Sequence, residues 1–183
     1  MHKKTVKLTL SAVFMALGMV LPFLTGQVPQ IGSMLLPMHL PVFLCGLICG
    51  WKYGAAVGLI LPLLRTAVFG MPPVYPTAIA MAFELLTYGL VSGLVYHRGH
   101  QNVVKLYGAM VIAMVSGRVV WGIAQLVLLG IKGNAFTLQA FISGALLSAV
   151  PGIVLQLVLI PVIMVALDKG GIIRFRKTVK AAG

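Results

Sequence analysis

Long apolar runs, separated by short polar or proline-rich breaks, fill most of the chain. Each run is close to the roughly 20 residues that an α-helix needs to cross a bilayer, and the runs do not alternate as the strands of a membrane barrel do. The pattern predicts an all-α integral membrane protein, a bundle of about six transmembrane helices in a single transmembrane domain, residues 1–183. The helices are expected at about 5–24, 38–50, 53–69, 77–96, 104–129 and 138–167.

Prolines mark the sharpest of the breaks. The stretch 70–76 holds three prolines, which lack a backbone donor and clash with the preceding helical turn. The helix before this stretch is therefore expected to end near residue 69. Pro151 and Pro161 fall inside the last expected helix and predict bends in it.

Composition places the chain in lipid. Hydrophobic residues make up 60% of the sequence and charged residues 9%, and the mean hydropathy is +1.07, whereas about a quarter of the residues of a soluble domain are charged. A small domain in water buries only part of its surface, so lipid is expected to solvate much of this chain. The first apolar run is read as a retained helix and not as a signal peptide, because it is long and no small-residue cleavage site follows it.

The basic residues predict the orientation in the cell membrane. The chain has 14 Lys and Arg but only 2 acidic residues. Such an excess suggests nucleic acid in a soluble protein, but here the basic residues lie at the ends of the apolar runs, so no nucleic-acid partner is expected. Cytoplasmic ends are rich in Lys and Arg, so both termini are placed in the cytoplasm, which leaves Lys132 outside. The cytoplasmic set is Lys3, Lys4, Lys7, Lys52, Arg98, Lys105, Lys169, Arg174, Arg176, Lys177 and Lys180.

Three charged residues lie inside the expected spans and away from their ends: Arg65, Glu84 and Arg118. A charge inside lipid is costly, so each is a candidate for function. At about 1.5 Å per helical residue, all three lie in the outer half or near the centre of the bilayer, from where they can line one outward-facing pocket. Two interpretations are open. In the first, Glu84 forms a structural ion pair with one arginine; in the second, an arginine binds an anionic substrate in bidentate fashion.

Polar and aromatic neighbours extend this candidate substrate-binding set. Arg118, Trp121 and Gln125 are spaced i, i+3, i+7 and share one helix face. Tyr88 follows Glu84 by one helical turn. Trp121 is either a pocket residue or an ordinary packing aromatic, since tryptophan is also common as an anchor near membrane boundaries.

His39 opens the second expected helix, directly after Pro37 and Met38. A satisfied helix-end group is its more ordinary role, and a ligand contact is the alternative. Cys45 and Cys49, four residues apart in an apolar run, are expected to be small core residues and not metal ligands or a disulfide.

No catalytic pattern appears in the sequence. It contains no carboxylate pair, no HExxH and no Walker A motif, and Asp168 beside Lys169 is expected to be a solvated charge. The chain is therefore expected not to be an enzyme, to hold no metal and to bind no cofactor itself. An intramembrane enzyme is the least favoured alternative.

Ala12 and Ala16 form a small-xxx-small pair on the first expected helix. Such a pair lets two helix backbones approach closely in lipid. Packing within the bundle and contact with a partner subunit are both open as its role.

These features together resemble the substrate-binding S component of energy-coupling factor (ECF) vitamin transporters. The shared features are about six helices in about 180 residues, a basic N-terminus and a long loop after the first helix. The resemblance extends over nearly the whole chain. It also rests on Ala12-Val13-Phe14-Met15-Ala16 and on the glycine rhythm Gly46, Gly50, Gly54 and Gly58.

The resemblance implies a substrate-specificity subunit of an ECF-type ABC importer. Such a subunit captures a water-soluble vitamin in an outward-facing pocket between the outer parts of its last three helices, covered by the loop after the first. Here that loop is Thr25 to Pro37 and includes Gln30. Ala12 and Ala16 would contact the transmembrane coupling subunit, while two cytoplasmic ATPase subunits would use the ATP. The subunit would then topple in the membrane to release its cargo.

The spare arginine favours an anionic vitamin such as pantothenate or folate, and pantothenate is ranked first. Pyridoxine or a pyrimidine precursor of thiamine come next, because a ring donor of either can use Glu84 as its acceptor. A stand-alone secondary transporter is one alternative, although internal repeats with paired broken helices are not evident. A membrane scaffold, which needs no pocket, is the other.

Overall fold

The computed structural model of the chain describes residues 3–25, 35–99, 101–131, 133, 137 and 149–170. Five segments in these ranges are long and apolar enough to cross a membrane, and a sixth apolar helix is shorter. No strand occurs in the described part, and the predicted all-α membrane bundle is confirmed. The elements are α1 (Lys3–Val20), the 3₁₀ turn η1 (Leu21–Thr25), α3 (His39–Cys49), α4 (Trp51–Phe69), the π-type turn η2 (Val74–Ala78), α5 (Ile79–His97), α6 (Val103–Ile131) and α8 (Val150–Lys169).

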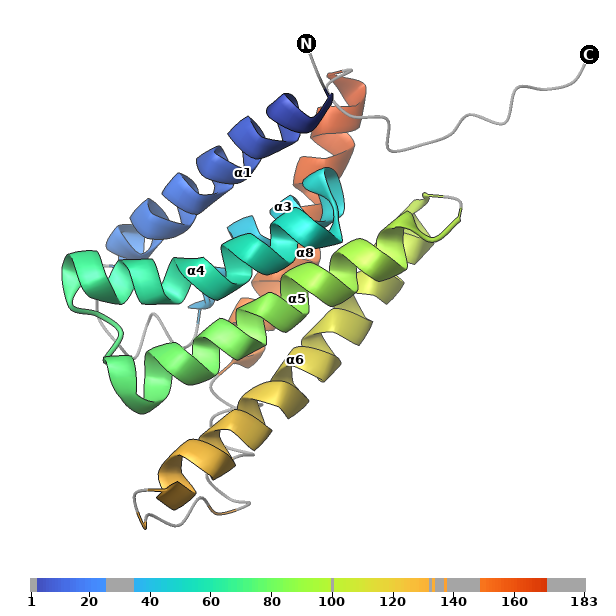
Figure 1. Cartoon of the computed structure of the whole chain (residues 1–183). Helices are drawn as coiled ribbons and strands as arrows, with labels where there is room; N and C mark the ends of the chain where they lie inside the picture. The colour runs from blue at the N-terminus through green and yellow to red at the C-terminus, as the bar shows by residue number, and fades with distance from the viewer. Residues whose placement is uncertain are drawn as a thin grey trace, which may run out of the picture.

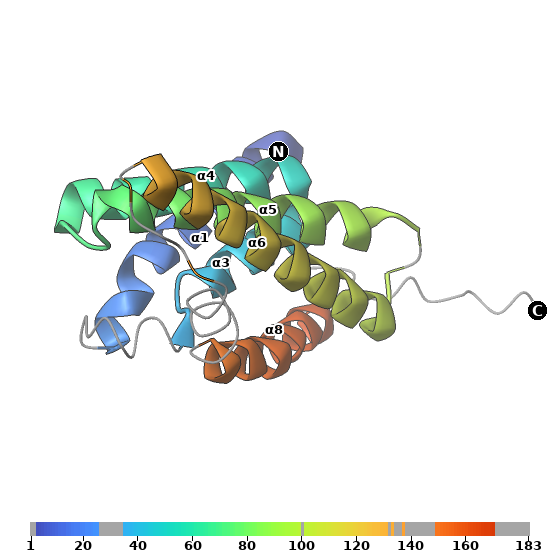
Figure 2. The same ribbon diagram turned by 90° about the horizontal axis from the view of Figure 1, so that it is seen from below.

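The helices form two layers. Helices α4, α5 and α6 lie side by side as successive neighbours, and α1, α3 and α8 lie against them (Figures 1 and 2). Helix α3 is the central element, because it contacts α1, α4, α5 and α8. This position explains how a helix of only 11 residues is held in the bundle: it is surrounded by protein on most sides.

Glycines bring the backbones of α3, α4 and α5 into direct contact. A Cβ atom at Gly58 would lie 2.2 Å from the carbonyl oxygen of Leu85, and one at Gly89 would lie 2.2 Å from the backbone of Gly54. Association of helices in lipid depends on such close packing, because lipid is as apolar as the side chains. The glycine seam, as we call it, consists of Gly46, Gly54, Gly58, Gly89 and Gly93.

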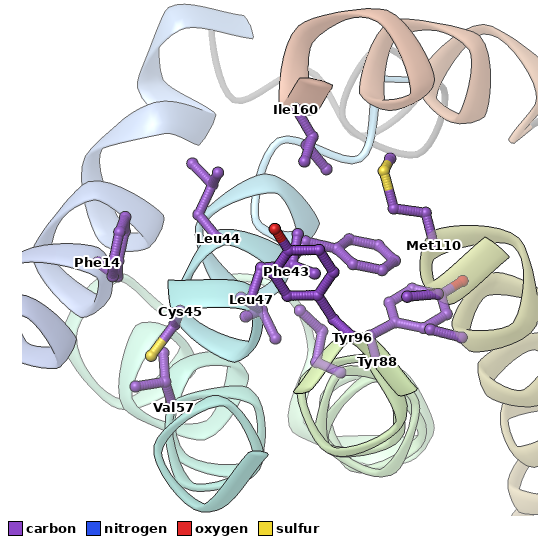
Figure 3. Packing of buried hydrophobic residues seen from close by; sticks show 14 of the residues in the cluster. Phe14, Phe43, Leu44, Cys45, Leu47, Val57, Tyr88, Tyr96, Met110 and Ile160 are labelled. Carbon is purple, nitrogen blue, oxygen red and sulfur yellow. The ribbon is translucent and has the colours of Figure 1, made fainter. Parts of the chain in front are cut away.

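Large side chains fill the space where α3, α5, α6 and α8 meet. Phe43, Tyr88, Met110 and Ile160 converge there from these four helices (Figure 3). The rings of Phe43 and Tyr88 stack with their centroids 5.0 Å apart. Helix α8 contacts α3 and α6, and its buried residues Ile160 and Met164 belong to this cluster.

Helix α3 begins inside the bundle. Its first residue, His39, is buried, and Met38 at the N-cap position provides no side-chain hydrogen bond to the helix. Eleven residues span about 16 Å, roughly half of the hydrocarbon thickness of a bilayer. The N-terminal turn of α3 therefore lies at mid-depth and not at a membrane surface.

The proline-rich break separates α4 from α5. Helix α4 ends at Phe69, and Gly70 adopts the left-handed conformation (φ 71°) that commonly terminates a helix. Tyr75 interrupts η2 with an extended backbone (φ −118°, ψ 133°). Its hydroxyl donates a hydrogen bond to the carbonyl oxygen of Leu128, which ties this segment to the last turns of α6.

The last helix differs from its expected range. Residues 138–148 of the expected helix 138–167 lie outside the described residues, and α8 begins at Val150. Pro151 stands in its first turn, where a missing backbone donor breaks no helical hydrogen bond. Pro161 lies within the helix.

The described basic helix ends lie at one end of the bundle. The start of α1, the turn between α3 and α4, the turn between α5 and α6, and the end of α8 are together in Figure 1. They carry Lys4, Lys52, Arg98, Lys105 and Lys169. The positions match the expected single basic end, and the side of the membrane on which it lies stays a prediction.

Candidate functional site

Glu84 of α5 is the centre of a buried polar cluster. Its Oε1 atom lies 3.0 Å from Nη1 of Arg118 on α6 and 3.5 Å from Nε2 of His39 on α3. The hydroxyl of Tyr88 donates a hydrogen bond to the same oxygen over 3.1 Å. Three helices thus bring together four of the residues predicted for the site, which we call the Glu84 cluster: His39, Glu84, Tyr88 and Arg118.

The contact between Glu84 and Arg118 explains how two charges persist inside the bundle. An isolated carboxylate or guanidinium is costly to bury, and a close, hydrogen-bonded partner offsets much of that cost. Of the two intramembrane arginines, the structure pairs Arg118 with Glu84. The sequence left open whether Arg65 or Arg118 pairs with Glu84, and the structure assigns Arg118.

Arg118 keeps a second edge of its guanidinium unused. Its Nε and Nη2 atoms are buried and have no hydrogen-bond partner among the described residues. The Nε–H and the adjacent Nη2–H point in the same direction, and this two-donor edge matches a carboxylate or a phosphate. Because buried donors are nearly always paired in proteins, the edge indicates a site for an acceptor group with two oxygens.

His39 adds a polar ring beside this ion pair. Both ring nitrogens are buried, and neither forms a hydrogen bond with another described residue, although Nε2 lies near Glu84. The ring packs 5.2 Å from that of Tyr88, measured between centroids. Its backbone N–H donates to the carbonyl oxygen of Leu36 over 3.0 Å, so the helix-end role expected for His39 involves the backbone and leaves the imidazole available.

Tyr88 is fixed by its neighbours on both sides. Its ring stacks on Phe43, and a Cβ atom at Gly117 would lie 2.2 Å from the ring. The ring therefore fills the space between α3 and α6, and its hydroxyl is directed at Glu84. In this position Tyr88 orients the carboxylate, and its predicted contact with substrate stays a prediction.

Helix α6 presents its other predicted site residues on the face that carries Arg118. Gln125 is buried two turns beyond Arg118, and Trp121 is half-buried between them. The shared face points into the bundle, since residues on the opposite face, such as Val119 and Ile123, are exposed. This is the arrangement that the i, i+3, i+7 spacing indicated, and substrate contact by Trp121 and Gln125 stays a prediction.

Arg65 of α4 has other partners. Its Nη1 donates a hydrogen bond of 2.5 Å to the carbonyl oxygen of Met19 at the end of α1. Its guanidinium lies 5.3 Å from the ring centroids of both Phe23 and Phe69, a distance at which cation–π attraction applies. The structure does not bring Arg65 into the Glu84 cluster, so a single pocket lined by all three intramembrane charges is not what the described contacts show.

Gln156 of α8 was not singled out from the sequence. It is 2% exposed, and its Nε2 atom donates to the carbonyl oxygen of Leu36 over 3.4 Å. That carbonyl is the one that also accepts the backbone N–H of His39. The sequence held a signal for it, because Gln156 is the lone polar side chain between Val150 and Leu167.

Gln30, the remaining predicted substrate-binding residue, lies outside the described residues. The two cysteines are free and buried in α3, and the Sγ atom of Cys45 donates to the Ser11 hydroxyl over 3.5 Å. Within the described ranges, no group of three or more metal-ligating side chains is found.

Helix α1 leaves the predicted partner-contact pair on its outer surface. Ala12 and Ala16 are exposed, whereas Ser11, Phe14 and Gly18 are buried against α3 and α4. The bundle described here therefore does not use the alanine pair for its own packing. A shallow surface of small side chains remains on this face, suitable for a close helix–helix contact in lipid.

A family model described as "ECF transporter, substrate-specific component" matches residues 6–174. The comparisons with curated proteins and with solved structures give no match. The family match spans almost all of the chain and all six apolar helices of the described part. Members of this family are membrane-embedded transport subunits that bind a small-molecule substrate and interact with the transmembrane and ATPase modules of ECF transporters. The chain belongs to the family of ECF transporter substrate-specific components.

Proposed function

We propose that this substrate-specific subunit captures a small vitamin-like molecule that carries a carboxylate, and that a pantothenate-like anion is its first candidate cargo. The observation that carries the proposal is the two-donor edge of Arg118 beside Glu84, which has no hydrogen-bond partner among the described residues. A guanidinium edge binds a carboxylate through two parallel hydrogen bonds. Trp121 and Gln125, on the same face of α6, are proposed to contact the rest of the molecule, and Gln30 is proposed as a further contact.

The charge of the surroundings also favours an anion. Glu84 neutralises Arg118, so the pair alone has no net charge. The N-terminus of α3, which begins at His39, adds the partial positive charge of a helix dipole. The Nδ1 atom of the His39 imidazole, buried and without a hydrogen-bond partner in the described structure, supplies a polar partner for a hydroxyl or carbonyl group of the cargo.

A second class of cargo has a specific observation in its favour. The three contacts of Glu84 converge on Oε1, and Oε2 takes part in none of them. An acceptor oxygen at this position suits the ring donor of a pyridoxine-like molecule or of a pyrimidine precursor of thiamine. For these molecules Glu84, and not Arg118, would make the selective contact.

Calorimetric titration of the purified protein in detergent tests the proposal. We expect pantothenate to bind saturably and pantothenol, which replaces the carboxylate by a neutral alcohol, to bind about 100-fold more weakly, because charge-assisted hydrogen bonds to the guanidinium are lost. Tight binding of pyridoxine or the pyrimidine instead would select the second class. Equal binding of pantothenate and pantothenol would contradict the anionic cargo. So would the absence of binding by every member of this ligand panel, which consists of pantothenate, pantothenol, pyridoxine and the pyrimidine.

The energy for uptake is proposed to come from outside this chain. Two cytoplasmic ATPase subunits would use ATP as their cofactor, and the transmembrane coupling subunit would transmit the work through the exposed pair Ala12 and Ala16. Uptake by the isolated subunit in vesicles without these partners would instead favour a stand-alone secondary transporter. A chain that bound no small molecule and tolerated loss of Arg118 would behave as a scaffold.

Substitution of Ala16 by Trp tests the docking face. A large side chain there would hold the coupling subunit away, so we expect ATP-dependent uptake by the reconstituted complex to fall at least about tenfold, while substrate affinity of the subunit alone stays unchanged. Val13→Trp is the matched control, because Val13 is 49% exposed on the same helix and outside the alanine pair. Similar uptake by the two variants would contradict a role for the pair.

A further inference from the structure

Gln156 interrupts the most hydrophobic span of the protein. Helix α8 has the highest mean hydropathy of the five candidate spans, 2.6, and Gln156 lies on its buried stripe with Gly152, Ile160 and Met164. An amide buried in such surroundings is unfavourable unless it is hydrogen-bonded. Its hydrogen-bond partner is a backbone carbonyl outside α8, that of Leu36.

A chain of contacts leads from Gln156 to the Glu84 cluster. The carbonyl oxygen of Leu36 accepts hydrogen bonds from Gln156 Nε2 and from the backbone N–H of His39. The imidazole of His39 then lies 3.5 Å from Glu84. Each link is local, and together they connect α8 with the first turn of α3 and with α5.

The connection depends on the backbone conformation of Leu36. It has φ 50°, the left-handed region, and no other non-glycine residue of the described part has a positive φ. A leucine in this region is strained and persists only when its surroundings hold it. Two donors on its carbonyl, one from α8 and one from α3, are such surroundings. Because Leu36 lies three residues before His39, its conformation sets how α3 begins.

We propose that Gln156 is a positioning residue of the substrate site, which holds the turn at Leu36 and thereby directs the His39 imidazole toward Glu84. The proposal rests on the proposed function, because the cluster it positions is the proposed substrate site. It gives α8 a part in substrate affinity without direct contact between Gln156 and the cargo. A purely structural Gln156 would only fasten α8 to the bundle.

Three variants separate the positioning role from the structural one. Gln156→Leu removes the amide, keeps a side chain of similar volume, and is compatible with a lipid-embedded helix. Met164→Ala, two turns away on the same buried stripe, loosens the packing of α8 without touching the Leu36 contact. His39→Ala removes the group through which Gln156 is proposed to act.

The first readout needs no ligand. Hydrogen exchange of the backbone amide of His39 is expected to become at least about tenfold faster in Gln156→Leu, and to stay unchanged in Met164→Ala, because only the former loses the second donor on Leu36. Unchanged exchange in Gln156→Leu would overturn the proposal. This measurement gives a result even if the cargo proposed above is wrong.

The second readout is the dissociation constant of whichever panel ligand binds the wild-type protein. Gln156→Leu is expected to weaken it about 5- to 20-fold, and to have no further effect in a His39→Ala background, since the two residues act in series. Equal losses in both backgrounds, or a loss matched by Met164→Ala, would show that Gln156 only supports the bundle. Absence of binding by the wild type counts against the proposed cargo and leaves the exchange experiment to decide this inference.

Discussion

Substitution of Arg118 by Gln is expected to abolish substrate binding and to destabilise the protein, whereas substitution of both Arg118 and Glu84 by Gln restores stability but not binding. The single change leaves the Glu84 carboxylate buried without its partner at 3.0 Å, and breaking a buried ion pair in this way costs about 3–5 kcal/mol. The double change removes both charges together and leaves two amides of similar shape. Thermal melting and calorimetric titration of the same samples measure the two effects separately.

Arg118→Lys is the control for charge alone. A lysine ammonium can pair with Glu84 but offers no rigid two-donor edge, so this variant is expected to melt close to the wild type and to bind a carboxylate ligand at least about 30-fold more weakly. A double Gln variant that bound substrate like the wild type would show that the pair of Glu84 and Arg118 is structural. In that case the anionic cargo would lose its main support.

Substitution of Gly58 by Ala is expected to prevent formation of the folded bundle. The new methyl group would lie 2.2 Å from the carbonyl oxygen of Leu85, and a backbone atom cannot move aside as the end of a flexible side chain can. Helices α4 and α5 would have to separate along the glycine seam. We expect the loss of folding free energy to exceed the roughly 1–3 kcal/mol that is typical of an overpacked core. The yield of monodisperse protein in size-exclusion chromatography and the melting temperature measure the effect.

Gly108→Ala is the matched control for this prediction. Gly108 lies within α6, and no atom would come within 4 Å of its added Cβ. The substitution is expected to leave the melting temperature unchanged or to raise it slightly, because alanine favours the helical conformation by roughly 0.5–1 kcal/mol over glycine. If Gly58→Ala and Gly108→Ala behaved alike, the contact between α4 and α5 would be looser than the seam indicates.

The helices could be predicted from the sequence because lipid leaves few alternatives. A chain that crosses a bilayer must satisfy its backbone hydrogen bonds within each span, so the lengths of the apolar runs and the prolines between them define most helix ends. The predicted end near residue 69 and the start of α6 near residue 104 illustrate this. For α8, the expected start near 138 falls outside the described residues.

The partner of Glu84 could not be predicted in the same way. Arg65 and Arg118 have the same chemistry, and the expected depth of Glu84 falls between theirs, so the sequence does not decide between them. The structure separates them through a local contact. Arg65 donates to the carbonyl oxygen of Met19 in the last turn of α1, and carbonyls at a helix C-terminus commonly accept side-chain donors. This contact leaves Arg118 as the partner of Glu84.

The proposed role of Gln156 could not be predicted from the sequence for a different reason. A lone glutamine in an apolar helix marks an interhelical contact but does not name the partner. The partner is the carbonyl of Leu36, which has a left-handed backbone conformation. Neither the leucine nor the residues next to it in the sequence predict that conformation. The sequence likewise shows the regular spacing of the glycines in α3 and α4 but not which backbones they approach.

The buried start of α3 determines which step of transport needs work. Its N-terminus, which has no side-chain cap, and the edge of Arg118 that no described residue contacts both present positive potential in a region that lipid screens poorly. The proposed anionic cargo would complete this balance, so its capture would be thermodynamically downhill and would need no energy source. The same stabilisation must be undone when the cargo leaves. For a subunit built in this way, the ATP hydrolysis proposed for the partner subunits would be required for release of the cargo and not for its capture.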